Sequence, residues 1–139
     1  ATNLLTYDYG TIVNSRWNFI ADQWKLGLLV QMTKGNKLTE SYQWSARLHS
    51  DIFFAATSGK IGLRDDRTYA PKLTQKTIIQ DGLTYLSVYT GYDTYGNVGT
   101  VTATGPSGSK RTIDRTYYID AANNILHQLK NETTTVVTP

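Results

Sequence analysis

The chain has 139 residues, of which 40% are hydrophobic and 18% charged, and these values describe an ordinary globular protein rather than a disordered one. Its formal net charge of +3 is too small for a histone-like polyanion binder, although segregated charges can still bias one patch. The absence of cysteine excludes disulfides, thiol nucleophiles and thiolate metal sites. We therefore expect a single domain spanning residues 1–139.

Two short β-type segments come first along the chain. Leu4–Tyr9 and Thr11–Ile20 are rich in Thr, Tyr, Val and Ile, and Gly10 separates them, which predicts an N-terminal hairpin. The longest apolar stretch, residues 26–30, is far too short to span a membrane, and the first residues lack the pattern of a leader. We expect a soluble protein with no membrane partner.

The segment Trp24–His49 has the clearest pattern in the sequence. Apolar and polar residues alternate in two runs around the turn Thr33–Lys37, and a period of two is typical of half-buried antiparallel strands. The apolar side of this predicted hairpin comprises Trp24, Leu26, Leu28, Val30, Met32, Leu38, Tyr42, Trp44, Ala46 and Leu48. The polar side comprises Lys25, Gln31, Ser41, Gln43, Ser45 and Arg47, which include no acid and therefore suit an anionic, hydrogen-bonding partner.

Further strands and turns are predicted between residues 53 and 104. Gly-containing turns at 80–82 and 95–97 separate β-rich runs, whereas Arg64–Arg67 followed by Pro71 indicates an exposed loop that ends near Thr74. The expected strands are Phe53–Ala56, Lys60–Leu63, Thr77–Ile79, Leu83–Tyr92 and Val98–Thr104.

The C-terminal third permits two interpretations. Tyr118, Ala122, Ile125 and Leu129 recur at spacings of four, three and four, which favours an amphipathic helix over residues 112–130 after the turn at 105–109. Asn is a poor helix former, so Asn123 and Asn124 instead favour strands at 117–119 and 125–126 around an Ala-Ala-Asn-Asn turn. We expect an α+β fold, mainly antiparallel sheet with a C-terminal helix, and keep an all-β barrel or sandwich as the alternative.

Catalytic patterns are weak throughout the chain. The glycine-rich segment Gly105–Thr112 has the wrong spacing for a Walker loop, and a plain turn is the better interpretation. His49, Ser50 and Asp51 are adjacent on a predicted strand, so their side chains alternate between faces and cannot form a triad. We expect no enzyme activity, no catalytic residue, no metal site and no cofactor.

The predicted strand Leu83–Tyr92 carries a second alternating set. Tyr85, Ser87 and Tyr89 would interleave with Lys25, Ser45 and Arg47 if both sets shared one sheet surface. Exposed aromatic rings stack on unpaired bases and cations meet phosphates, which is how looped or single-stranded RNA is held on a sheet. A merely solvated sheet face is the alternative for the same residues.

The hairpin Lys25–Arg47, the strand Tyr85–Tyr89 and the predicted helix from Thr112 together resemble the coat proteins of single-stranded RNA bacteriophages. The resemblance implies a viral structural protein that assembles into a shell in the host cytoplasm, becomes part of the virion and binds single-stranded or hairpin RNA. It also implies the RNA-binding residues Lys25, Ser45, Arg47, Tyr85, Ser87 and Tyr89.

A sheet with one helix per chain has too little material to cover its apolar side, so a two-fold partner donating a second helix would complete the fold. We expect a homodimer whose interface includes Tyr117, Tyr118, Ile125 and Leu129. The competing hypothesis is a monomeric lipocalin-like β-barrel that binds a small apolar ligand near Trp17, Trp24 and Trp44, residues that otherwise serve as core.

Overall fold

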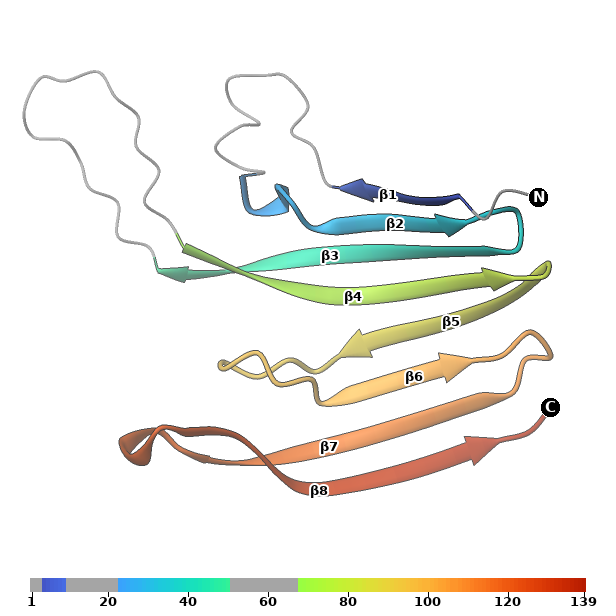
Figure 1. Cartoon of the computed structure of the whole chain (residues 1–139). Coiled ribbons are helices and arrows are strands. Elements are labelled where there is room, and N and C mark those ends of the chain that lie inside the picture. The colour runs from blue at the N-terminus through green and yellow to red at the C-terminus, as the bar shows by residue number, and fades with distance from the viewer. Residues whose placement is uncertain (1–3, 10–22, 51–67) are drawn as a thin grey trace, which may run out of the picture.

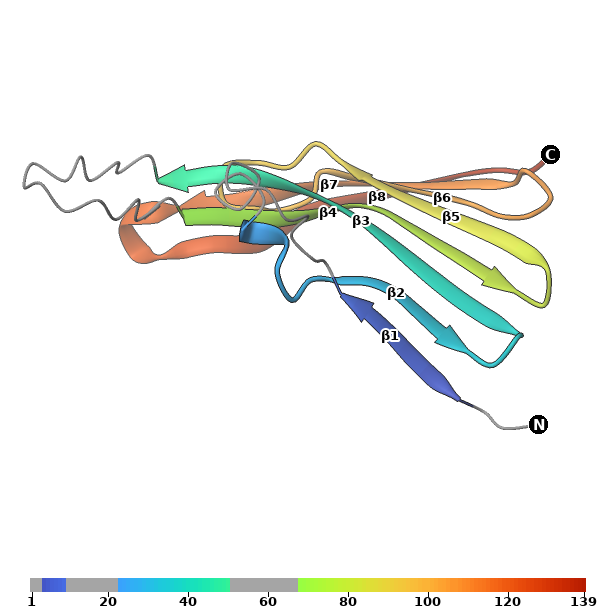
Figure 2. The ribbon, with the colours of Figure 1, turned by 90° about the horizontal axis from the view of Figure 1, so that it is seen from above.

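The computed structural model describes residues 4–9, 23–50 and 68–139, with the backbone alone at residues 23, 47–50 and 68–69. The described chain forms one eight-stranded antiparallel sheet in which each strand pairs with the next in sequence (Figure 1). Seen from above, this sheet is a single twisted layer (Figure 2). Its elements are β1 (Leu5–Tyr9), η1 (Gln23–Lys25), β2 (Leu29–Lys34), β3 (Leu38–Ser50), β4 (Thr68–Gln80), β5 (Leu83–Thr90), β6 (Thr100–Thr104), β7 (Lys110–Asp120), η2 (Ala121–Asn123) and β8 (Ile125–Val137).

The mainly antiparallel β prediction is confirmed, but the predicted C-terminal helix is wrong. Residues 112–130 belong to a hairpin in which β7 pairs with β8, so the alternative with an Ala-Ala-Asn-Asn turn is the correct one. Asn124 adopts a left-handed conformation with φ 58°, and the Asp120 side chain accepts a hydrogen bond from the Asn123 backbone N–H. Asn tolerates this conformation better than most residues, which is why the pair forms the turn.

The expected dimer interface must also be revised, because it assumed that residues 112–130 form a helix. Tyr117 pairs with Leu129 across the hairpin, Tyr118 pairs with Gln128, and Ile125 pairs with Asp120. These residues therefore lie on two strands instead of one helix face. Because β-branched and aromatic residues are frequent in both strands, packing on a pleated surface outweighs the helical spacing. Residues 112–130 therefore cannot supply the helix that a partner was expected to donate as the cover for this sheet.

The central hairpin is confirmed, with a later start than predicted. β2 begins at Leu29, because Gln23–Lys25 forms the 3₁₀ helix η1 and the Leu28 N–H donates to the Lys25 carbonyl at 3.2 Å. The two strands pair as expected, with Met32 opposite Glu40, but the turn comprises residues 35–37 because Thr33 and Lys34, predicted to lie in it, belong to β2. The strands expected at 11–20, 53–56 and 60–63 lie outside the described residues.

The loop predicted to end near Thr74 is wrong for residues 68–74, which belong to β4. Pro71 pairs with Ala46 of β3, while β5 pairs with β4 only at residues 75–80. Pro71 therefore lies where β4 has a neighbour on one side, and a residue without an N–H is tolerated there. Beyond this point, Asp81 and Gly82 both have positive φ (49° and 79°), as required in the type I′ turns that favour hairpins.

Hydrogen bonds of Asn97 hold the connection between β5 and β6 against β8. Asn97, 7% exposed, is the buried polar residue of the described chain. Its Nδ2 donates to Asp93 Oδ2 at 2.8 Å and to the Leu126 carbonyl at 2.7 Å, and its Oδ1 accepts from the ring N–H of His127. We call these three side-chain contacts the Asn97 clamp, because they join this connection to the start of β8.

A hydrophobic core is missing from the sheet itself. Within residues 4–9, 24–46 and 70–139, no hydrophobic residue is buried, and large apolar side chains such as Leu83 and Val136 are 50% and 63% exposed. The strand order runs from β1 to β8 without closure between these two in the described part of the chain, so the sheet there is open and not a barrel. The described residues therefore supply no second layer over the sheet.

Candidate nucleic-acid interface

The strand registers define the two faces of the sheet. Residues that pair directly across antiparallel strands point to the same face, and neighbours along a strand point to opposite faces. One face, called the apolar face here, contains Leu5, Tyr7, Met32, Leu38, Glu40, Tyr42, Trp44, Lys76, Ile78, Leu83, Tyr85, Ser87, Tyr89, Val101, Ala103, Arg111, Ile113, Arg115, Glu132 and Val136.

The opposite face, called the polar face here, is dominated by hydroxyl and amide side chains. Its members include Thr6, Asp8, Gln31, Thr33, Thr39, Ser41, Gln43, Ser45, Lys72, Gln75, Thr77, Thr84, Leu86, Val88, Thr90, Thr100, Thr102, Thr104, Lys110, Thr112, Asp114, Thr133 and Thr135. The sheet thus has one apolar and one hydrophilic side, as the alternating patterns predict.

The six residues expected to bind RNA do not share one surface. Ser45 is exposed on the polar face and pairs with Lys72, whereas Tyr85, Ser87 and Tyr89 belong to the apolar face. The backbone of Arg47 pairs with Ala70, and its side chain lies outside the described residues.

Lys25 lies in η1, before β2 begins, with its Nζ 5.5 Å from the centroid of the Trp24 ring. The expectation of a common surface is wrong because the sequence does not show which residues of one strand face the same side as those of another. The register decides this, and it pairs Tyr85 with Ile78 and Ile78 with Glu40. A shift of one residue exchanges the two faces.

The part of the polar face around Ser45 is the best candidate for contact with a polyanion. We call Gln31, Ser41, Gln43, Ser45, Lys72 and Gln75 the central polar patch; it spans β2, β3 and β4 and contains no acid. The acids of the polar face, Asp8 and Asp114, lie in β1 and β7, and Asp114 accepts a hydrogen bond from the Thr100 hydroxyl at 2.7 Å. Hydroxyl, amide and ammonium groups are those that contact phosphates and sugars.

Lys72 is the cation of this patch, and sequence reasoning missed it. Its Nζ lies 5.0 Å from the centroid of the Tyr92 ring, and the Tyr92 hydroxyl donates to the Leu73 carbonyl at 2.6 Å. Burial raises the pKa of Tyr92 above its ordinary value, with a further contribution from Tyr89, so the ring stays neutral beneath the ammonium. The nearby Pro71 suggested a loop, whereas the residues that flank it continue the alternation of a strand.

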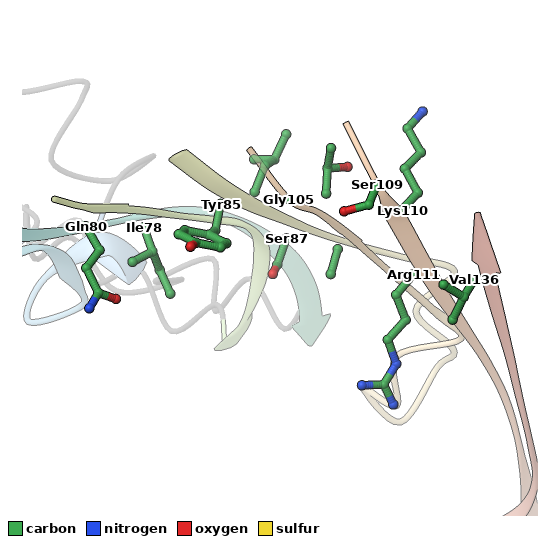
Figure 3. Close-up of a pocket in the computed structure, with 12 residues that line it drawn as sticks. Ile78, Gln80, Tyr85, Ser87, Gly105, Ser109, Lys110, Arg111 and Val136 are labelled. Atoms are coloured by element: carbon green, nitrogen blue, oxygen red, sulfur yellow. The ribbon is translucent and has the colours of Figure 1, made fainter. Parts of the chain in front are cut away.

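The apolar face has a shallow concavity over β4–β8 (Figure 3). It has a volume of about 500 Å³, and its walls include Ile78, Tyr85, Ala103 and Val136. Arg111 and Ser87 extend on the same side of the strands as Tyr85, while Lys110 points to the other side (Figure 3). Tyr85, expected to stack on a base, is 40% exposed within this concavity.

A second concavity, of about 280 Å³, lies beside η1. Trp24, Trp44, Tyr42 and Val30 line it, and the Trp44 indole N–H donates to the Leu29 carbonyl at 2.8 Å. Both tryptophans are half-buried, so they are neither a closed core nor the interior of a barrel. Trp17 lies outside the described residues.

The charged residues of the apolar face largely pair within the chain. Lys76 Nζ lies 2.8 Å from Glu40 Oε2 and 5.3 Å from the centroid of the Tyr42 ring, while Arg115 Nε lies 2.9 Å from Glu132 Oε2. The hydrogen bonds from Lys76 and then Tyr42 hold the pKa of Glu40 below its ordinary value. Both carboxylates of this face are therefore compensated locally.

Other site classes find no support in the described ranges, where no cluster of His, Asp or Glu could hold a metal ion. No helix in that same part of the chain combines the length and apolar character needed to cross a membrane. Searches with the whole sequence and structure match no protein-family model, no curated protein and no solved structure.

Proposed function

We propose that this chain is a viral coat subunit, which assembles through homodimers into a shell and contacts single-stranded genomic RNA through its polar face. One observation carries this proposal: the sheet has an apolar face, and no hydrophobic residue is buried within residues 4–9, 24–46 and 70–139. A protein of this size ordinarily builds a core of its own. A chain that instead leaves the face exposed is suited to an assembly in which other subunits cover it.

The exposed side chains support the same conclusion. Large apolar residues of this face, such as Tyr7, Leu83 and Val136, are 48%, 50% and 63% exposed. Several contacts per subunit, as a shell requires, would remove such side chains from water.

The central polar patch supports RNA as the enclosed polymer. Its hydroxyls and amides can contact phosphates and 2′-hydroxyls, and Lys72 adds a cation without a neighbouring acid in the patch. It presents few exposed aromatic rings for reading bases, so we expect binding that tolerates many sequences. This chemistry agrees with the hairpin part of the resemblance to RNA bacteriophage coat proteins, whereas the helical part has no counterpart at residues 112–130.

Size-exclusion chromatography with light scattering, followed by electron microscopy of the recombinant protein, tests the proposal. We expect dimers and larger closed particles, with copurifying RNA that nuclease and high salt remove from the dimers. A monodisperse monomer of 15.6 kDa that stays monomeric with added single-stranded RNA would refute it. Particles that form without any affinity for RNA would retain the shell and refute the RNA contact.

A further inference from the structure

We propose that a second copy of this chain covers the apolar face, sheet on sheet, so that the two polar faces become the outer surfaces of a two-layer sandwich. This inference rests on the proposed function, because it supposes that the chain associates with itself. It replaces the donated helix with a second sheet, which is the element that this chain actually possesses.

The distribution of apolar side chains identifies the face that must be covered. Leu5, Tyr7 and Leu83 of the apolar face are 43%, 48% and 50% exposed, and they lie on strands from β1 to β5. Val136 extends the same surface to β8 with 63% exposure. The face is therefore apolar from one edge of the sheet to the other. Threonines dominate the reverse side, although Ile79 and Val137 on that side are also 44% and 59% exposed.

Charge does not oppose burial of this face. Glu40 and Glu132 are matched by Lys76 and Arg115 of the same chain, so a cover that supplies no counter-charge leaves neither carboxylate alone. Two further cations of this face, Arg111 and Lys34, lie near the β6–β7 and β2–β3 turns, where a solvated rim would form around the interface. Ion pairs that are already satisfied are far less costly to bury than isolated charges.

A second copy fits better than another occupant. Because the apolar face extends over the whole sheet, each chain needs one covering partner whenever it folds. A second copy of the same chain is always present in equal number. Two identical faces related by a two-fold axis also close the assembly without leaving an open end. Sheets packed face to face lie about 10 Å apart and interdigitate their side chains.

The concavity around Tyr85 is where this interdigitation would be deepest. Its volume of about 500 Å³ can receive several partner side chains, and its walls at Ile78, Ala103 and Val136 are apolar. RNA is the rival occupant, since Tyr85 could stack on a base and Arg111 could meet a phosphate. The second cation of the lining, Lys110, points to the opposite side of the sheet, so RNA would find one cation there (Figure 3).

A thiol-protection experiment decides between these occupants, because the sequence has no cysteine of its own. Ser87→Cys probes the apolar face, and Thr102→Cys probes the polar face from the neighbouring strand; both native side chains are half-buried. Reaction with a disulfide reagent such as DTNB is measured on RNA-free dimers. We expect at least tenfold slower modification of Ser87→Cys than of Thr102→Cys, and similar rates once urea dissociates the dimers.

Four results have distinct meanings. Slow modification of Ser87→Cys in RNA-free dimers supports the inference. Dimers or particles in which both variants react equally fast would overturn it while the proposed function stands. Protection of Ser87→Cys that appears only after single-stranded RNA is added would also overturn it and move RNA to the apolar face. A monomer would overturn both proposals, and Ala103→Cys, opposite Ser87, replaces a variant that does not fold.

Discussion

Replacing Asn97 with alanine should remove the Asn97 clamp and destabilise the protein by about 3 kcal/mol. The substitution deletes two donated hydrogen bonds of 2.8 and 2.7 Å and one accepted from His127. It leaves the Leu126 carbonyl without this donor, and an unsatisfied buried polar group costs about 1–3 kcal/mol, with more for the charged Asp93. For a chain of this length, about 3 kcal/mol corresponds to a fall in melting temperature of roughly 10 °C.

Urea denaturation followed by tryptophan fluorescence measures this effect, at one fixed protein concentration because association contributes to stability. Asn131→Ala is the matched control, since Asn131 is exposed on β8 and should change the free energy of unfolding by less than about 0.5 kcal/mol. Equal midpoints for Asn97→Ala and the control would refute the idea that the clamp holds the β5–β6 connection to β8.

Three further predictions concern charge, pH and the C-terminal turn. Lys72→Ala should lower the slope of log K for RNA against log salt by about one. Lys34→Ala should not, because Lys34 pairs with Leu5 and Leu38 and therefore lies on the apolar face; filter binding across salt concentrations checks both variants. Burial raises the pKa of Asp93, but hydrogen bonds from the Asn97 side chain and from the backbone N–H groups of residues 95–97 outweigh it and lower the net pKa. Its contribution to stability is therefore complete above about pH 4 and lost as the pH falls through the lowered pKa, so Asp93→Asn should flatten the acid limb of the stability curve. Asn124→Gly should leave the melting temperature nearly unchanged, whereas Asn124→Val should lower it by several degrees, because a β-branched residue is strained at φ 58°; calorimetry that ranks the two variants equally would contradict this.

Local chemistry made the β5 hairpin predictable. The alternation in Leu83–Tyr92 and the turn residues Asp81 and Gly82 act within a few positions of one another, and the structure has a turn there followed by β5. No distant contact was needed to specify this part of the fold, because both the period and the turn type are properties of adjacent residues.

The C-terminal hairpin shows where the same reasoning failed. Tyr118, Ile125 and Leu129 fit a helical spacing by coincidence, whereas the β-branched residues at 133–137 and the pair Asn123–Asn124 were the stronger signals. The candidate site failed for a different reason. Each strand shows which of its residues share a face, but only the register joins the faces of two strands, and it put Ser45 and Tyr85 on opposite sides.

The strict neighbour-to-neighbour strand order has a consequence for how particles could grow. Because every ladder joins strands that are adjacent in sequence, the correct alignment of all eight can develop hairpin by hairpin on a single nascent chain. The strand order would then be established within each chain before subunits associate, whereas the association of subunits would supply stability. In the proposed shell, the concentration of subunits, rather than a slow rearrangement of topology, would then set the rate of particle formation.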